Sequence, residues 1–173
     1  YSFQWSARNA TGLSAAAGPI NALTLPAQPQ DFAIQPGSVQ ATQVTVQWSG
    51  TSPNPDDYTL RYSTDPGLAG ASSLTPGGGA TNQSVSGLTP NTTYYFQLVA
   101  NNATGASQAT AIISQLTLPA APTGLTVSDV TTTSLKLTWA AAPPSNPAGY
   151  ELRISPNPGV TLPIALGGGD TSY

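Results

Sequence analysis

Hydrophobic and polar residues alternate along five short stretches of the chain. These stretches are VTVQW at 44–48, YTLRY at 58–62, YYFQLVA at 94–100, LKLTW at 135–139 and YELRI at 150–154. A period of two places every second side chain on one face, which is the signature of a half-buried β-strand. Turn-forming clusters such as DPG at 65–67 and PGGG at 76–79 separate the stretches, and no stretch has the period of an amphipathic helix. The pattern therefore predicts an antiparallel β-sandwich.

The chain also repeats itself at a distance of about 90 residues. The matching segments and residues are YSFQWSARNATG at 1–12 with YYFQLVANNATG at 94–105, TLP at 24–26 with TLP at 117–119, Trp48 with Trp139, and Tyr58 with Tyr150. The offset between the first two pairs of segments is constant, and it changes by one or two residues for the other pairs, as loop insertions would cause. Such a period indicates tandem copies of one structural unit.

A longer alternating pattern surrounds the stretch at 94–100. It reads Leu88-x-Pro90-x-Thr92-x-Tyr94-x-Phe96-x-Leu98-x-Ala100-x-Asn102-x-x-Gly105. This pattern resembles the E–F corner and F strand of a fibronectin type III domain, and Trp48, the 58–62 stretch and the opening Pro29-x-x-Phe32 fit the same family. The resemblance implies an all-β chain of tandem fibronectin type III (immunoglobulin-like) antiparallel β-sandwiches. Each would have seven strands, A, B, C, C′, E, F and G, in two sheets. The integrin-type RGD loop of the family is absent.

The resemblance covers essentially the whole chain and predicts three segments. Residues 27–119 are expected to supply all seven strands of one complete domain. Residues 1–26 correspond to the F and G strands alone, and residues 120–173 correspond to the A strand through the start of the E strand. The two partial segments are therefore expected to be complementary halves of one sandwich.

Each partial segment is expected to expose apolar side chains and open sheet edges unless something completes it. Three interpretations are then possible. The chain is part of a long covalent array of domains, or it is a separate subunit that polymerises head to tail by strand exchange. In the third interpretation, the positions of its ends have no biological meaning. The ten residues 84–93 have no counterpart between Tyr173 and Tyr1, which favours the covalent array. No signal peptide is visible and Tyr1 is not a natural start, so we expect the start to be arbitrary relative to the domains.

The aromatic residues of the alternating stretches are expected to form the structural core. Trp48 and Trp139 alternate with Val or Leu on one strand face, and Trp5 matches Leu98 of the repeat. A hydrophobic core is therefore favoured over a surface that stacks sugars. The expected core residues are Phe3, Trp5, Trp48, Tyr94, Phe96 and Trp139.

The composition argues against several classes of function. The chain has four Lys and Arg, seven Asp and Glu, a net charge of −3, and neither His nor Cys. Scattered basic residues argue against nucleic-acid binding, and the lack of Cys excludes a disulfide framework and a thiolate metal site. No apolar run approaches the length of a membrane span.

Few residues are available for catalysis. Without His or Cys, the usual general base and the thiol nucleophile are missing. Asp56 and Asp57 are expected to be solvated turn residues, and with Asp65 they offer too few ligands to favour a calcium site. The glycine-rich 76–79 turn precedes no predicted helix, so it does not indicate a phosphate loop. We therefore expect no enzymatic activity, no cofactor and no metal.

Four Asn-x-Ser/Thr sequons offer sites for glycans if the source glycosylates asparagine. They are Asn9, Asn82, Asn91 and Asn102. Asn9 and Asn102 occupy equivalent places at the end of the F strand. The alternative for these two is that the asparagine caps the turn between the F and G strands.

These observations favour a non-catalytic structural segment of a secreted or cell-surface filament, such as an adhesin stalk. Its expected partners are copies of itself or adjacent repeats, joined head to tail. Proline-containing joints such as LTLPAAP at 116–122 favour a semi-rigid connection between domains. The alternatives are a spacer or binding module of a secreted carbohydrate-active enzyme, which a catalytic domain in the full-length gene would favour, and a phage or virion decoration protein.

Overall fold

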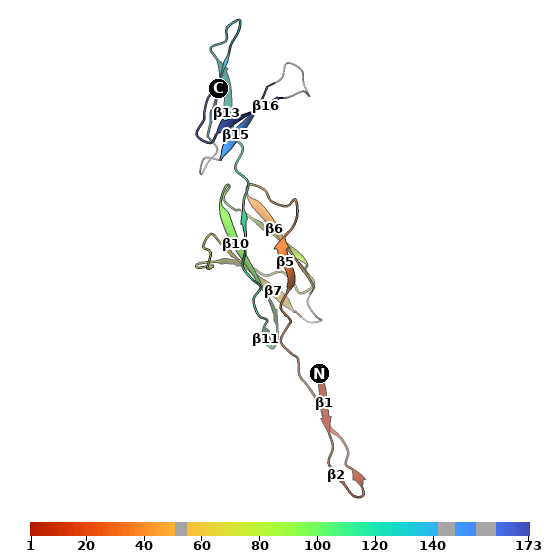
Figure 1. The fold of residues 1–173 in the computed structure, drawn as a ribbon. Helices are drawn as coiled ribbons and strands as arrows, with labels where there is room; N and C mark the ends of the chain where they lie inside the picture. Colours follow the sequence, from red (N-terminus) through yellow and green to blue (C-terminus); the bar gives the residue numbers. More distant parts are fainter. Residues whose placement is uncertain (51–54, 142–147, 155–161) are drawn as a thin grey trace. The chain divides into compact units, whose positions relative to one another are not determined.

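The computed structural model describes residues 1–50, 55–141, 148–154 and 162–173 of the chain. All helical or strand structure in these ranges is β-strand (Figure 1). The strands are β1 (Ser2–Trp5), β2 (Arg8–Asn9), β3 (Gly12–Leu13), β4 (Ala17–Asn21), β5 (Gln30–Ile34), β6 (Gln43–Ser49), β7 (Asp57–Ser63), β8 (Ser72–Leu74), β9 (Asn82–Ser86), β10 (Thr93–Asn102), β11 (Gly105–Ala106), β12 (Ile113–Leu116), β13 (Thr123–Ser128), β14 (Lys136–Ala140), β15 (Gly149–Ile154) and β16 (Leu162–Gly167). This architecture confirms the all-β fold that the alternating pattern predicted.

The chain divides into two compact units that interleave along the sequence. The first unit comprises residues 1–33, 47–83 and 95–113, and the second comprises residues 34–46, 84–94 and 114–173. Strands such as β6 and β10 begin in one unit and end in the other. The units are therefore not consecutive stretches of sequence.

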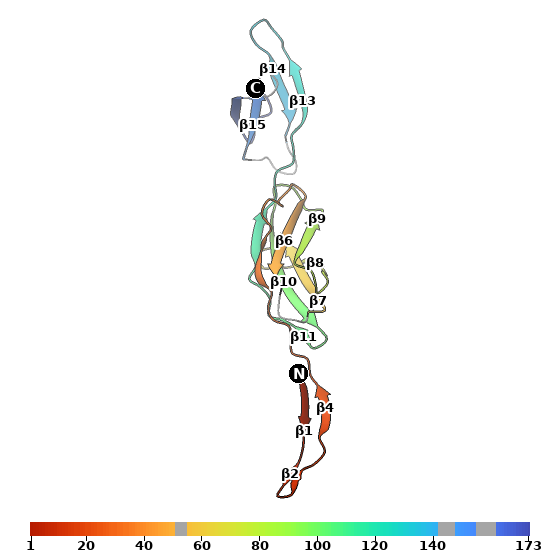
Figure 2. The same cartoon turned by 90° about the vertical axis from the view of Figure 1, so that its right-hand side faces the viewer.

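The main sheet of the first unit is built on β7 and β10, which Figure 2 shows side by side. The strand order is β11-β10-β7-β8, and β12 also pairs with β10. The antiparallel register sets Leu98 opposite Leu60 and Ala100 opposite Tyr58. All four side chains are at most 1% exposed, since alternate residues of a strand share one face. Thr59 and Val99, which lie opposite each other between these positions, face the other side of the sheet.

A second sheet has the order β5-β6-β9. Trp48 on β6 meets Tyr58 on β7 edge to face, with ring centroids 5.1 Å apart and planes at 62°. The backbone N–H of Trp48 donates a 2.9 Å hydrogen bond to the Thr81 carbonyl, and this bond holds the chain that leads into β9 beside β6. The aromatic pair joins a side chain of one sheet to a side chain of the other, as in the core of a β-sandwich.

In the second unit, a buried threonine ties the corner before β10 to the end of the repeat. The Thr117 hydroxyl donates to the Thr89 carbonyl at 2.8 Å and accepts from the Thr92 N–H at 3.0 Å. The Tyr94 hydroxyl accepts a 3.0 Å hydrogen bond from the Thr89 N–H. Thr117 is only 1% exposed, so its hydroxyl satisfies backbone groups that have limited access to water.

The C-terminal part of the second unit consists of two strand pairs, β13–β14 and β15–β16. Trp139 on β14 meets Tyr150 on β15 edge to face at 5.8 Å and 71°. The backbone N–H of Trp139 donates a 3.1 Å hydrogen bond to the Thr171 carbonyl. These contacts have the same form as those of Trp48 with Tyr58 and Thr81, so the sequence repeat is also a repeat of three-dimensional contacts.

The six aromatic residues expected in the core fall into two groups. Trp48, Phe96 and Trp139 are buried, and Tyr94 is half-buried. Phe3 and Trp5, by contrast, are 55% and 59% exposed. Their strand, β1, pairs only with β4 among the described strands. Within the described residues the two side chains therefore remain outside any core, and a core role for them requires further strands.

Candidate functional site

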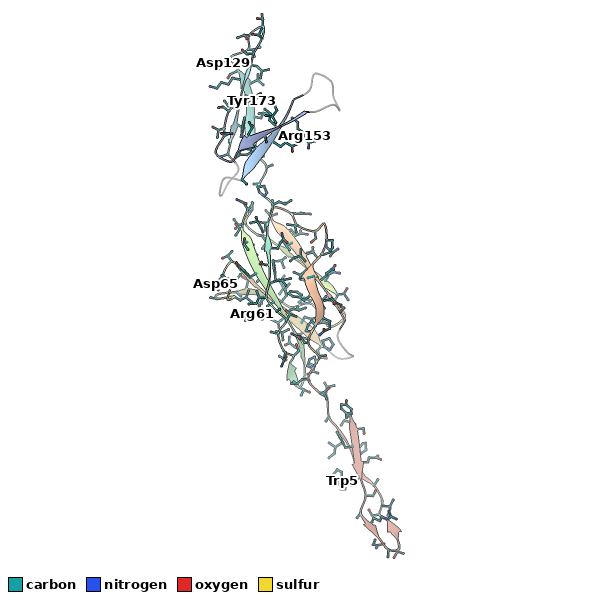
Figure 3. The ribbon with its side chains drawn as sticks, viewed as in Figure 1. Trp5, Arg61, Asp65, Asp129, Arg153 and Tyr173 are labelled. Carbon is teal, nitrogen blue, oxygen red and sulfur yellow. The ribbon has the colours of Figure 1, made fainter. Side chains whose placement is uncertain are left out.

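The charged residues near the 65–67 turn, Arg61 and Asp65, form hydrogen bonds with the backbone of residues 67–69. The Asp65 carboxylate accepts hydrogen bonds from the N–H groups of Gly67 and Ala69, at 2.8 and 3.1 Å. Arg61 Nη2 donates to the Leu68 carbonyl at 3.3 Å, and Figure 3 shows both charged residues at this loop. These contacts give the side chains a structural role.

Asp57 is also engaged, because its carboxylate accepts a 2.7 Å hydrogen bond from Asn101 Nδ2. In the described part of the chain, no group of three or more Asp, Glu, His or Cys is placed to hold a metal ion. The hydrogen bond of Asp57 gives its carboxylate a structural role.

Two of the four sequons lie in the turns of equivalent hairpins. The side-chain oxygen of Asn102 accepts from the N–H groups two and three residues further on, at 2.9 and 3.2 Å. The side-chain oxygen of Asn9 makes the same two bonds, at 2.8 and 3.1 Å. Both asparagines thus cap a turn. Asn82 is exposed at the start of β9, and Asn91 has a φ of 48°. Glycan attachment at the four sequons stays a prediction.

The linker before the 27–119 repeat is bound to the turn that Asn102 caps. Asn102 Nδ2 donates to the Thr24 carbonyl at 2.8 Å, and the Thr104 hydroxyl donates to the Leu23 carbonyl at 3.1 Å. The sequence analysis missed this contact. The repetition of the NATG and TLP segments indicated that both have a structural role, but their spacing did not predict a contact between them.

The N-terminal hairpin carries an apolar face without a cover. Phe3 on β1 lies opposite Ile20 on β4, and Ile20 is 54% exposed. The Tyr1 ring lies 6.5 Å from the Phe3 ring, and Trp5 lies further along the same hairpin (Figure 3). An apolar patch of this kind marks an interaction surface or an aggregation hazard.

An apolar groove of about 350 Å³ opens in the C-terminal part of the chain. Its lining includes Pro122, Leu125, Trp139, Tyr150, Leu152 and Leu166. Leu125 is 64% exposed, and Tyr150 and Leu152 are half-buried. The groove therefore lies over the inner face of β14 and β15, where a sandwich would have its core.

Around its turn, the N-terminal hairpin has the same strand pairing as the β10–β11 hairpin of the 27–119 repeat. Arg8 pairs with Leu13 and Asn9 with Gly12, in the register that Asn101 and Asn102 have with Ala106 and Gly105. Next to this turn, the Ser14 N–H donates to the Ala7 carbonyl at 2.8 Å, as the Ser107 N–H does to the Ala100 carbonyl at 2.8 Å. The hairpin therefore already has the form that closes the sheet in the complete repeat.

The groove is lined by residues whose counterparts are covered in the 27–119 repeat. Tyr58 and Leu60, the counterparts of Tyr150 and Leu152, are 1% and 0% exposed. In that repeat β7 lies between β10 and β8, whereas β15 pairs only with β16 among the described strands. Tyr150 and Leu152 are more exposed than their counterparts because β10 lies beside β7, whereas no described strand takes that position beside β15.

The sequence of the 27–119 repeat matches a known family. The family model described as "Fibronectin type III domain" matches residues 27–115, a little more than half of the chain. The chain belongs to the fibronectin type III family. The strand pattern around Tyr94 and Phe96, on which the resemblance rested, lies inside the matched region.

Solved structures of fibronectin type III domains resemble the chain. A two-domain segment from chicken tenascin is 23% identical, matches 84% of this chain and 80% of that chain, and gives a TM-score of 0.57. The FN1–FN3 domains of chicken CNTN1 are 21% identical over 68% of this chain and 41% of that chain, with a TM-score of 0.49. The tenascin match has the fold of consecutive fibronectin type III domains, so the prediction of a tandem arrangement is confirmed.

Membership of the family assigns a class of function. Fibronectin type III domains are structural or binding modules, generally without catalytic activity, and are typical of extracellular or surface proteins. No helix long and apolar enough to cross a membrane occurs among the described residues. The described residues also include a hairpin whose apolar face is exposed and an apolar groove.

Proposed function

We propose that the chain is a non-catalytic structural segment of a secreted or cell-surface filament made of tandem fibronectin type III repeats. Residues 1–26 are the F and G strands of one domain, residues 27–119 form a complete domain, and residues 120–173 form the A strand through the start of the E strand of another. A neighbouring unit, or the continuing chain, completes both partial domains head to tail.

The observation that carries this proposal is the complementarity of the two partial segments. Residues 1–21 present the hairpin that the complete repeat uses beside β7, and its Phe3 and Trp5 are more than half exposed. Residues 119–166 present the groove that lacks such a hairpin. A contact between two different surfaces does not close on itself and can therefore extend into a filament.

Low charge fits the same function. The chain has only eleven charged residues, four basic and seven acidic. Mutual repulsion between neighbouring repeats is therefore small, and exposed polar side chains can form hydrogen bonds between units. A secreted or surface location, which is common for this family, follows from the proposal.

Electron microscopy of the native material, with a denaturing gel of the same sample, tests the proposal. Filaments with an axial repeat that matches one or two sandwiches support it. A gel band near 17.5 kDa would identify separate subunits, and a very large chain would identify a covalent array. Dispersed monomers without filaments would refute the filament function and favour a spacer module.

A further inference from the structure

We propose that the NATG turn of the complete repeat, residues 102–105, is a clasp for the LTLP joint that leads into the same repeat, residues 23–26. Asn102 and Thr104 hold the joint, and they bind it by its main-chain carbonyls. The inference concerns the order of the joint within one chain. It requires tandem repeats but does not depend on the proposed filament.

The clasp consists of two side-chain donors that meet two consecutive carbonyls. Asn102 Nδ2 donates to the Thr24 carbonyl at 2.8 Å, and the Thr104 hydroxyl donates to the Leu23 carbonyl at 3.1 Å. Asn102 Oδ1 meanwhile accepts from the N–H groups of Thr104 and Gly105. The Asn102 side chain therefore shapes the turn with one atom and binds the joint with the other.

Gly105 lets the joint lie against the turn. Its φ is 145°, a conformation that residues with a side chain rarely adopt. A Cβ at this position would lie only 3.0 Å from Leu25 Cδ2. The Asn, Thr and Gly of the NATG motif thus each meet the LTLP joint, whereas Ala103 between them is exposed.

The sequence of the joint suits a fixed conformation. Pro26 holds its own φ near about −65° and restricts Leu25 to extended backbone. Pro26 and Pro29 are both buried, and Gln28 Nε2 donates to the Ala109 carbonyl at 2.6 Å. The clasp therefore acts on a segment that has few conformations to lose, which keeps the entropy cost of holding it small.

The second LTLP segment, residues 116–119, leaves the same repeat and is held by a different part of the motif. The Thr117 hydroxyl donates to the Thr89 carbonyl at 2.8 Å, and the Leu118 N–H donates to the Gln40 carbonyl at 3.2 Å. The repeat thus binds its entry joint by carbonyls and its exit joint by a threonine hydroxyl. Because these are different atoms, one LTLP joint can be bound by the repeat before it and the repeat after it at once.

The clasp uses both side chains that define the Asn102 sequon. A glycan on asparagine would be attached at Nδ2, the atom that binds the Thr24 carbonyl. The Asn-x-Thr pattern of this turn therefore has a structural explanation that requires no modification.

Substitutions that change single groups separate the clasp from the turn cap. Asn102→Asp keeps an oxygen for the N–H groups that Asn102 caps, but it replaces the donor Nδ2 by a second oxygen that faces the Thr24 carbonyl. Thr104→Val removes the hydroxyl that binds Leu23, and Thr104 is exposed. We therefore expect the double variant to keep the turn and to release the joint.

Relaxation of ¹⁵N in the main-chain amides measures the order of the joint. Rigid backbone gives an order parameter of about 0.85, and flexible backbone gives values below about 0.6. We expect Thr24 and Leu25 to be near the rigid value in the native chain and below about 0.6 in the Asn102→Asp/Thr104→Val double variant. A flexible joint in the native chain, or a rigid joint in the double variant, would overturn the clasp.

The NATG copy at residues 9–12 provides the matched control. Asn9 caps its turn with the same two bonds as Asn102, and within the described part of the chain neither Asn9 Nδ2 nor the Thr11 hydroxyl binds a joint carbonyl. The Asn9→Asp/Thr11→Val double variant should leave the order of Thr24 and Leu25 unchanged. An equal loss of order in both double variants would show that residues 102–105 are not the clasp.

The single variant Thr104→Val keeps the test decisive if the aspartate at position 102 unfolds the repeat. It removes one hydroxyl from an exposed residue, so we expect the fold to be retained. The order parameters of Leu23 and Thr24 should then fall below their native values. Native values at both residues in this variant would refute the holding role of Thr104.

Discussion

Replacement of Thr117 by valine is a sharp test of the corner that closes the complete repeat. The Thr117 hydroxyl donates to the Thr89 carbonyl and accepts from the Thr92 N–H, and its side chain is 1% exposed. Valine has nearly the same shape but no hydroxyl, so packing is retained and both backbone groups lose a partner. Partly buried groups left without a partner cost about 1–3 kcal/mol. We expect a loss of about 2 kcal/mol, because two groups lose this partner but neither is fully buried.

Urea unfolding followed by tryptophan fluorescence measures this loss. Trp48 is the probe of the complete repeat, in a background in which Trp5 and Trp139 are both replaced by phenylalanine. For a domain of this size a urea slope of about 1–2 kcal/mol per M converts the expected loss into a midpoint lower by about 1–2 M. The slope itself should not change.

Thr24→Val is the matched control. Thr24 is the counterpart of Thr117 one repeat earlier, and it is exposed. Exposed substitutions of this kind change the free energy of unfolding by less than about 0.5 kcal/mol. An unchanged midpoint for Thr117→Val, or an equal loss for both variants, would refute the stabilising role of the buried hydroxyl.

Three further pairs of variants compare equivalent or alternative residues by urea unfolding followed by far-UV circular dichroism, because the Trp48 variants lack the fluorescent probe. Phe96→Ala is expected to destabilise its repeat by about 3–5 kcal/mol, whereas Phe3→Ala in the unassembled chain should change stability by less than about 0.5 kcal/mol; similar losses would contradict the difference in burial. Asn102→Ala should cost about 1–2 kcal/mol and more than Asn9→Ala, because it also removes the bond to the linker carbonyl; equal losses would show that the bond contributes nothing. Trp48 Nε1 is buried and has no hydrogen-bond partner among the described residues. Trp48→Phe should therefore cost less than the roughly 3–5 kcal/mol of Trp48→Ala, and equal losses would contradict this reasoning.

Much of the fold could be predicted because the apolar residues that a period of two places on one strand face are also the residues that are buried. The stretches at 44–48, 58–62 and 94–100 became β6, β7 and most of β10. In β10 Phe96, Leu98 and Ala100 are buried, and Gln97 and Val99 between them are only half-buried. The period of two therefore indicates which face of the strand is buried.

The exposure of apolar side chains in the two partial segments was predicted for a different reason. Neither Trp5 nor Leu152 has a local signal for exposure, but the repeat supplied a complete copy in which their counterparts are covered. The contacts of Thr117 with Thr89 and of Asn102 with Thr24 had no such guide. They join polar residues 28 and 78 positions apart, and the types of these residues are common in loops throughout the chain.

The ordered turn of the N-terminal hairpin has a consequence for the speed of assembly. A donor segment that is disordered before binding must lose backbone entropy of about 1–2 kcal/mol for each residue that becomes fixed. In this chain Asn9 already caps its turn and Ser14 already binds Ala7 before a partner arrives. Preorganisation of this kind lowers the free-energy cost of association. Growth of a filament would then be limited by encounter and by exclusion of water from the groove, rather than by folding of the incoming strand.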